Sequence, residues 1–360
     1  MEAFTCKTKI IAGAGAVAAL ESLHIQRLFL VCDPYFEENG KAKSLLDAAK
    51  CTDSQIFSDV VPDPSVELAA KGAAQVRQFN PDAVVALGGG SAMDSAKAMA
   101  FFSGCKPLLV AIPTTSGSGS EVTDFAILTH CGVKHPLVDD TIRPDVAILD
   151  SDMVSTLPPA LIADGGFDLI SHALEAVVAT NSSTFSDMLA IRAFETAIHH
   201  LQASYGGDRS VRGRIHEAAT MAGIAFSNAG LGLCHAISHS IGGEFHIPHG
   251  RLNAMLLPHV IEQNATVSCH RYAELARTIG LSSGSDVMAL RSLKNALLQL
   301  RRNLQLPETL AQAGISPTLV QEKMNTLVSA SLSDPCCKTN PVSVNEAIVR
   351  QIITEVTGRG

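Results

Sequence analysis

Four histidines lie within one stretch, LCHAISHSIGGEFHIPHG, at residues 233–250. They are His235, His239, His246 and His249, and the whole chain has only 13 histidines. Imidazole is the commonest side-chain ligand for transition metals. His235 and His239 are four residues apart, a spacing that places both on one face of a helix. The cluster predicts a metal site and leaves open which of the four histidines are ligands.

A second pair with this spacing lies upstream, in DGGFDLISHALEA, where Asp168 and His172 share a helical pattern. One carboxylate with two or three imidazoles suits a divalent first-row metal such as Fe(II) or Zn(II), without any thiolate. An isolated pair of this kind is usually a surface or capping pair. Two such pairs on apolar helices, followed by PHG at 248–250, favour a common metal site.

The motif GGGSAMDSAK, residues 88–97, follows the apolar run AVVAL and leads into a helical pattern. Its glycines let backbone N–H groups approach a pyrophosphate, and the helix directs its positive end at the anion. A tight strand-to-helix turn is the alternative, but such a turn seldom needs three successive glycines. A second polar loop, PTTSGSGSEVT at 113–123, ends the next strand. Together the two loops predict a nucleotide site.

A further glycine-rich segment, GAGAVA at 13–18, has Asp33 twenty residues after its first glycine. This spacing is similar to a dinucleotide-binding fingerprint with alanine in place of the third glycine. Taken alone, the segment is equally well explained as a turn between a strand and a helix.

These residues require a scaffold, and the two halves of the chain predict different ones. Short β-rich runs at 27–33, 82–90, 107–115 and 145–150 alternate with helical patterns, which is typical of a parallel, Rossmann-like sheet covered on both faces. After about residue 155 the apolar residues recur only at helical spacing. We therefore expect an α/β dinucleotide-binding domain over 1–155 and an all-α metal-binding and catalytic domain over 156–360.

Composition excludes several classes of function. The formal net charge of −8 and the absence of tryptophan argue against nucleic-acid binding, and no long unbroken apolar stretch predicts a membrane span. The nine cysteines form no CxxC pair, so a disulfide framework is not expected. The N-terminus lacks the features of a signal peptide. We expect a cytoplasmic protein.

The motifs resemble those of the iron-containing (group III) alcohol dehydrogenases. The resemblance runs in order from GGGSAMDSAK through PTTSGSGSEVT, DGGFDLISHALEA and FSNAGLGLCHAISHSIGGEFHIPHGRLNAMLLPHV to NP at 340–341. It implies a dehydroquinate synthase-like fold and an NAD(H)-dependent enzyme with iron(II), or alternatively zinc(II). Within the family the chain is most similar to members from propanediol-degrading bacterial microcompartments. This implies interconversion of small aldehydes and primary alcohols, a homodimer or higher oligomer, and association with a microcompartment.

The resemblance also assigns residues. It implies that Asp168, His172, His235 and His249 hold the metal, and that His239 faces the nicotinamide and substrate as a catalytic proton relay. His246 matches no ligand position. The resemblance places the pyrophosphate at residues 88–91 and the adenosine ribose at Asp33. GAGAVA is then a segment that supports the sheet. The residues expected to bind the cofactor are Asp33, Gly88, Gly89, Gly90, Ser91, Asp94, Thr114, Thr115, Ser118 and Lys134.

The chain departs from the family pattern at a few positions. DGGFD replaces the usual Thr-Gly-Met-Asp, and NPV replaces Asn-Pro-Arg near the C-terminus. A polyol dehydrogenase acting on glycerol or a propanediol is the alternative function. The residues expected around the metal are apolar, which favours small uncharged substrates; they are Phe226, Leu231, Ile237, Phe245 and Ile247.

Overall fold

The computed structural model describes residues 4–130 and 133–358. It divides into two compact units. The α/β unit comprises Thr5–Leu157 and Arg212–Gly223, and the helical unit comprises Phe4, Pro158–Val211 and residues 224–358. The predicted domain boundary at 155/156 stays a prediction.

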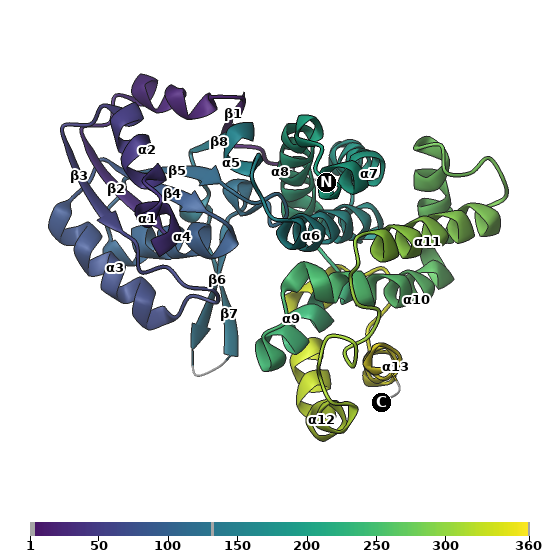
Figure 1. Ribbon diagram of the computed structural model, residues 1–360. Helices are drawn as coiled ribbons and strands as arrows, with labels where there is room; N and C mark the ends of the chain where they lie inside the picture. Colours follow the sequence, from purple (N-terminus) through teal and green to yellow (C-terminus); the bar gives the residue numbers. More distant parts are fainter. Residues whose placement is uncertain (1–3, 131–132, 359–360) are drawn as a thin grey trace. The chain divides into compact units, whose positions relative to one another are not determined.

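The α/β unit is built on a six-stranded parallel sheet with the order β1-β8-β5-β4-β2-β3 (Figure 1). Its strands are β1 (Lys9–Gly13), β2 (Arg27–Cys32), β3 (Asp53–Phe57), β4 (Ala83–Gly88), β5 (Leu108–Pro113) and β8 (Val146–Asp150). The chain runs outward from β2 to β3 and returns to β4 on the other side of β2. The topological switch point therefore lies between β2 and β4, where ligands of open α/β sheets bind at the strand ends.

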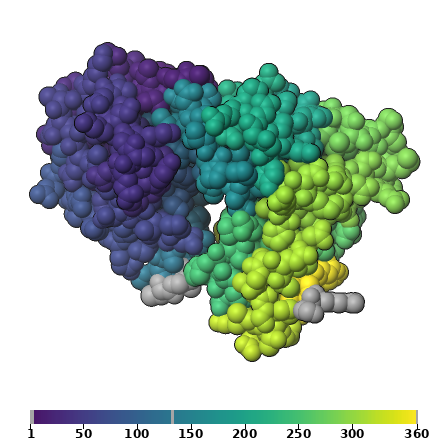
Figure 2. Space-filling view, viewed as in Figure 1, coloured from purple at the N-terminus to yellow at the C-terminus, as the bar shows by residue number. Residues whose placement is uncertain are grey.

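Helices cover both faces of this sheet because its strands are apolar on both sides. One face packs against η1 (Ala16–Leu23), α1 (Pro34–Glu38) and α2 (Lys41–Ala49), through residues such as Leu20 and Leu45. Figure 2 shows the outer surface of this N-terminal part of the chain in purple. The other face packs against α3 (Val66–Phe79) and α4 (Gly90–Ser103), where Met93 and Met99 are buried. The predicted α/β architecture is confirmed.

An antiparallel pair, β6 (Phe125–His130) with β7 (Val133–Val138), was not predicted. The residues of β6 alternate between buried and more exposed, and no Asn-Gly or Asp-Gly turn signal stands between the two strands in the sequence. The remaining short elements of the unit are η2 (Ser120–Val122), η3 (Asp140–Ile142) and α5 (Ser151–Val154).

The helical unit confirms the predicted all-α second half of the chain. Its described elements, with α8 shared between the two units, are α6 (Pro159–Val178), α7 (Thr184–Tyr205), η4 (Arg209–Val211), α8 (Arg212–Ala229), α9 (Leu233–Phe245), α10 (His249–Thr278), α11 (Asp286–Asn303), α12 (Pro317–Ser333), η5 (Pro335–Thr339) and α13 (Glu346–Thr357). Helix α6 packs against both α7 and α10, and α9 packs against α10 and α12. These contacts bring the two histidine-bearing segments of the sequence together.

Across residues 4–130 and 133–358, no single helix is long and apolar enough to cross a membrane. One bent pair, Arg209–Ala229 with Leu233–Phe245, meets the length and composition criteria together but turns by 105°. The eight cysteines that the structure describes are free thiols, and Cys131 lies outside the described residues.

Candidate functional site

Helix α6 carries the upstream part of the site on one face. Asp168, His172 and Glu175 follow one another at positions i, i+4 and i+7, a spacing that aligns side chains along a helix. All three residues are buried. A helix that buries two carboxyl groups and an imidazole requires partners for them from elsewhere in the fold.

Helices α9 and α10 provide those partners. The Asp168 Oδ1 atom lies 3.8 Å from His172 Nε2, 3.9 Å from His235 Nε2 and 3.7 Å from His249 Nε2. Donors at about 2.1 Å from one tetrahedral ion lie ~3.4 Å apart, and the possible ligand atoms of Asp168, His172 and His235 lie within 4.8 Å of one another. His249 approaches Asp168 but does not lie within this distance of all three. The structure thus brings together all four residues that the sequence analysis assigned to the metal.

The close approach of α10 to α6 depends on Gly250, which follows His249. A Cβ atom at this position would lie 1.8 Å from the carbonyl oxygen of Asp164. A side chain here would therefore push the start of α10, and with it His249, away from Asp168. This contact gives a physical reason for the glycine in the PHG sequence.

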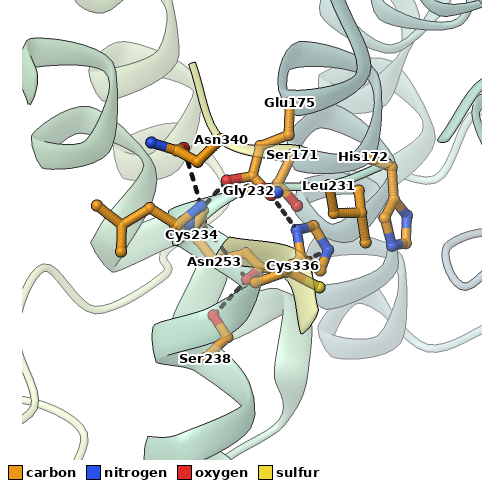
Figure 3. A network of polar contacts seen from close by, with 12 residues as sticks. Ser171, His172, Glu175, Leu231, Gly232, Cys234, Ser238, Asn253, Cys336 and Asn340 are labelled. Atoms are coloured by element: carbon orange, nitrogen blue, oxygen red, sulfur yellow. Dashed lines mark hydrogen bonds and ion pairs between the residues drawn. The ribbon is translucent and has the colours of Figure 1, made fainter. Parts of the chain in front are cut away.

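A set of hydrogen bonds around the cluster fixes the orientation of its side chains (Figure 3). The Glu175 carboxylate lies 2.6 Å from His235 Nδ1 and accepts hydrogen bonds from the backbone N–H groups of Gly232 and Cys234. Asn253 donates to Asp168 Oδ1 at 3.0 Å. With Nδ1 held by Glu175, His235 presents Nε2 to Asp168, as second-layer carboxylates do for metal-binding histidines.

The electrostatics of the cluster suit a bound cation. Burial raises the pKa of Asp168, against the opposing effects of His172, His239 and Asn253. Burial also raises the pKa of Glu175 to about 7, despite three backbone N–H groups that favour its charged form. The pKa of His235 is well below its ordinary value, mainly because of burial, so its ring is neutral and has a lone pair available. A divalent cation would balance both buried carboxylates.

His239 lies beside this cluster without joining its contacts to Asp168. Its ring stacks on that of His249, with centroids 5.0 Å apart and planes inclined by 14°. Its Nδ1 atom lies 2.8 Å from Asp334 Oδ2. His246 ends α9 in a left-handed conformation with φ of 54°, as a helix-terminating residue.

In the α/β unit, most of the predicted cofactor residues lie at the carboxyl ends of β2, β4 and β5, whereas Asp94 lies within α4 and Lys134 on β7. A Cβ atom on Gly88 would lie 3.7 Å from Asp33 Oδ2, so the two residues flank the switch point. Thr115 lies against Gly89 and Ser118 against Gly90. The N–H of Thr114 donates to the carbonyl of Gly88 at 2.9 Å and joins the two strand ends.

The first turn of α4 is suited to an anion. The helix begins at Gly90, directly before Ser91, and its N-cap Gly89 provides no side-chain cap for the backbone N–H groups. These groups and the helix dipole favour a phosphate at this point.

Two family models match the chain over nearly its whole length. The model described as "Fe-containing alcohol dehydrogenase family, C-terminal" matches residues 162–357, and the one described as "Iron-containing alcohol dehydrogenase" matches residues 7–151. The chain belongs to the iron-containing alcohol dehydrogenase family. The resemblance in the motifs is confirmed, and the protein is an alcohol dehydrogenase, an oxidoreductase.

Relatives of this alcohol dehydrogenase include two curated bacterial enzymes. It is 37% identical to the 1-propanol dehydrogenase PduQ of Citrobacter freundii, over 99% of this chain and 100% of that protein. It is 38% identical to an NADPH-dependent butanol dehydrogenase of Clostridium saccharobutylicum, over 98% of this chain and 97% of that protein.

Solved structures agree with the fold. The iron-containing alcohol dehydrogenase of Thermococcus thioreducens has a TM-score of 0.91 at 33% identity and covers 98% of this chain and 99% of its own. The sulfoacetaldehyde reductase of Bifidobacterium kashiwanohense, solved in complex with NAD+, has a TM-score of 0.89 at 26% identity and covers both chains fully.

Two residues of this alcohol dehydrogenase that were predicted to bind the cofactor have partners within the chain. Asp94 accepts hydrogen bonds from Ser120 Oγ and the N–H of Ile127, and burial raises its pKa. Lys134 forms an ion pair with Asp63 at 2.7 Å. Their roles at the cofactor stay predictions.

Lys97, the last residue of GGGSAMDSAK, has a structural role. It is almost fully buried and donates to Ser120 Oγ, Thr123 Oγ1 and the carbonyl of Phe125. Burial lowers its pKa to about 8, although the nearby carboxylates raise it. Lys97 and Asp94 therefore hold the 113–123 loop and β6 against helix α4.

The segment GAGAVA serves the fold. The N–H groups of Gly15 and Val17 donate to the Asp150 carboxylate at 3.0 and 2.9 Å. Asp150 ends β8, the neighbour of β1 in the sheet. These N–H groups are thus hydrogen-bonded to a carboxylate of the chain itself. This agrees with the supporting role expected for the segment.

Of the apolar residues expected around the metal, Ile237 is buried on α9, two residues after His235, and its place at the site stays a prediction. Phe226 does lie at the cluster, where its ring stacks on His172 with centroids 4.3 Å apart.

Sequence reasoning missed the residues that support the site. Two of them could have been found from their spacing in the sequence. Glu175 shares the helical face of Asp168 and His172, and Asn253 follows His249 by four residues. Asp334 had no such signal, and Asn340 was singled out only as part of the NP motif, without a role. Asn340 accepts a hydrogen bond from the N–H of Leu233 at 3.1 Å, which gives the NP motif a role at the start of α9.

Proposed function

We propose that this alcohol dehydrogenase interconverts small aliphatic aldehydes and primary alcohols with NAD(H), such as propanal and 1-propanol or acetaldehyde and ethanol. We infer that it works mainly as an aldehyde reductase that regenerates NAD+. The observation that carries the proposal is the convergence of three imidazoles on the buried carboxylate of Asp168, with a fourth imidazole, His239, stacked beside them.

Asp168, His172, His235 and His249 would hold the metal, iron(II) or alternatively zinc(II). The donor set supports this assignment, because one carboxylate and three imidazoles satisfy either ion. A bound cation would also balance the charge of the two buried carboxylates and favour their ionised forms. A bound divalent cation supplies Lewis-acid polarisation of a carbonyl or alkoxide oxygen.

His239 would move the proton that alcohol formation requires. An imidazole titrates near neutral pH and can both donate and accept a proton. Its ring stacks on that of His249, a proposed ligand, so His239 lies next to the metal site without being assigned as a ligand. This position supports a role as general acid in aldehyde reduction and as general base in the reverse direction.

The surroundings of the cluster support small uncharged substrates. Phe226 stacks against His172 on the apolar side of the site. Arg251, near His249 in sequence, uses Nε and Nη2 to bind the Asp164 carboxylate at 3.1 and 3.0 Å. This guanidinium is neutralised within the chain, so an anionic substrate would gain little from it.

The α/β unit would bind NAD(H) at the switch point, with the pyrophosphate on residues 88–91 and the adenosine ribose on Asp33. A carboxylate accepts hydrogen bonds from ribose hydroxyls and repels a 2′-phosphate, so Asp33 supports NADH over NADPH. The reductase solved with NAD+ agrees with this choice, whereas one relative is named as NADPH-dependent. Homo-oligomer formation and association with a bacterial microcompartment also stay proposals.

Steady-state kinetics of the anaerobically purified enzyme test the proposal. NADH oxidation would be measured with acetaldehyde, propanal, butanal, glycolaldehyde and dihydroxyacetone, alongside metal analysis. We expect one iron or zinc per chain and the highest kcat/KM with a C2–C4 aldehyde. Selectivity among these should be graded, because one methylene in an apolar pocket contributes only about 1–3 kcal/mol. A polyhydroxylated substrate with the highest kcat/KM would replace this proposal with a polyol dehydrogenase.

A further inference from the structure

The segment from Asp334 to Asn340 contacts helix α9 at two places. Asn340 accepts a hydrogen bond from the N–H of Leu233, the first residue of the helix. Asp334 contacts His239, which lies more than one turn further along. The short helix η5 (Pro335–Thr339) connects the two contacts. This segment therefore lies along the helix that carries both His235 and His239.

The two carboxylate oxygens of Asp334 have separate partners. Oδ1 accepts the N–H of Cys336 at 2.9 Å and caps η5, whereas Oδ2 lies 2.8 Å from His239 Nδ1. The Asp334 side chain is 14% exposed and that of His239 is 27% exposed. Burial raises the pKa of Asp334, but the hydrogen bonds from His239 and Cys336 outweigh it and lower the pKa to about 2. Asp334 is therefore ionised and can only accept hydrogen bonds.

This acceptor determines the state of the His239 ring. A neutral imidazole that donates from Nδ1 has its lone pair on Nε2. The stacked contact with His249 and the edge-on contact with His235, with centroids 6.1 Å apart at 66°, define the plane of the ring. With Nδ1 bound to Asp334, Nε2 is the ring nitrogen available for proton exchange.

We propose that Asp334 is a positioning residue that fixes the tautomer and orientation of His239 for proton transfer. The inference rests on the relay role proposed above for His239. The arrangement parallels Glu175 and His235, where a carboxylate also binds Nδ1. The consequence differs, because Glu175 directs a nitrogen towards Asp168 and the proposed metal, whereas Asp334 directs one towards the reacting proton.

A second cation site is the competing interpretation. The possible ligand atoms of His239, Asp334 and Cys336 lie within 4.8 Å of one another. However, Asp334 and His239 are already hydrogen-bonded to each other, and burial raises the pKa of the Cys336 thiol well above its ordinary value. A protonated thiol is a poor metal ligand, so the contacts favour the positioning role.

The test compares Asp334→Asn, His239→Ala and the double variant in the metal-loaded enzyme. Asparagine is also a good N-cap, so Asp334→Asn retains the contact with Cys336 and replaces the carboxylate oxygen that faces His239 Nδ1 with an uncharged NH2 donor. We expect kcat for aldehyde reduction to fall by about 10²–10⁴-fold, the usual contribution of a general acid or base. KM for NADH and the metal content should stay at wild-type values. Adding Asp334→Asn to His239→Ala should cause no further loss of kcat.

Asp187→Asn is the matched control, because Asp187 is a similarly buried carboxylate bound to Arg271 in the same unit. We expect it to leave kcat unchanged. If His239→Ala kept wild-type turnover, the proposed relay itself would be wrong. If His239→Ala lost turnover and Asp334→Asn did not, the relay would stand and the positioning role would be overturned. Two metal ions per chain, falling to one in Asp334→Asn, would instead establish the second cation site.

Discussion

The histidine cluster of the helical unit and the glycine-rich loop of the α/β unit achieve positioning in opposite ways. In the cluster, chemistry depends on side chains, and other buried side chains such as Glu175 and Asn253 orient them. In the loop, the groups offered to a ligand are backbone N–H groups at the start of α4, and the neighbouring side chains are mainly small. One site is organised by hydrogen bonds between side chains and the other by the absence of side chains.

This difference predicts different sensitivities. In the cluster, removal of one polar atom should disturb metal binding, because each buried partner fixes another. In the loop, addition of one carbon atom should disturb cofactor binding, because the backbone must approach the phosphates closely. The predictions below test this contrast, beginning with the largest expected effect.

His235→Ala should abolish both metal binding and turnover, because it removes one donor and leaves Glu175 without its imidazole partner. The fall in metal affinity should exceed the roughly 10–100-fold typical of a second-layer change. Metal analysis after anaerobic purification measures it. His239→Ala should retain the metal and His246→Ala should be the mildest variant. A metal-free His239→Ala protein would contradict the ligand assignment.

Glu175→Gln should weaken metal binding by about 10–100-fold without removing a ligand. The amide can still approach His235 Nδ1, but it brings no negative charge to balance the cation. Competition with a chelator measures the affinity. Glu195→Gln is the control, since Glu195 forms a surface pair with Arg192. Equal metal affinity in Glu175→Gln and the wild-type enzyme would show that the cluster does not need this carboxylate.

Gly88→Ala should weaken NADH binding by about tenfold, equivalent to ~1.4 kcal/mol, and leave metal content unchanged. The added Cβ would lie 2.5 Å from that of Ala92, so the loop must shift. Fluorescence titration with NADH gives the Kd, and thermal unfolding shows whether the fold is retained. Gly243→Ala is a steric control, because the new Cβ atom has open space around it and the backbone is not in the left-handed region. Loss of metal in Gly88→Ala would contradict the independence of the two sites.

Asp33→Gly should lower the ratio of kcat/KM with NADH to kcat/KM with NADPH. Among these variants it should have the smallest effect on the rate with NADH. Glycine is a tolerable N-cap, so α1 should lose only a few tenths of a kcal/mol of stability. The ratio of kcat/KM for the two cofactors is the readout. A wild-type enzyme that used both cofactors equally well would remove the basis for this assignment.

Local sequence patterns predicted much of the fold. Apolar runs bounded by glycine, proline or aspartate marked β2, β4, β5 and β8, and helical spacing marked the whole second half. Strand β3 and the β6–β7 pair were missed because they are short and partly polar, so their pairing depends on neighbours rather than on their own composition.

The amino-acid sequence by itself determined the kinds of chemistry available to this protein. The four-residue spacings placed Asp168 and His172, and His235 and His239, on common helical faces, and three glycines after a strand marked the anion-binding turn. Tertiary structure decided which side chains meet. The contacts Glu175–His235, Asn253–Asp168 and His239–Asp334 join residues 60, 85 and 95 positions apart. Periodicity reports only which face of a helix a residue occupies, and the partner that this face meets is determined by how helices distant in sequence pack together.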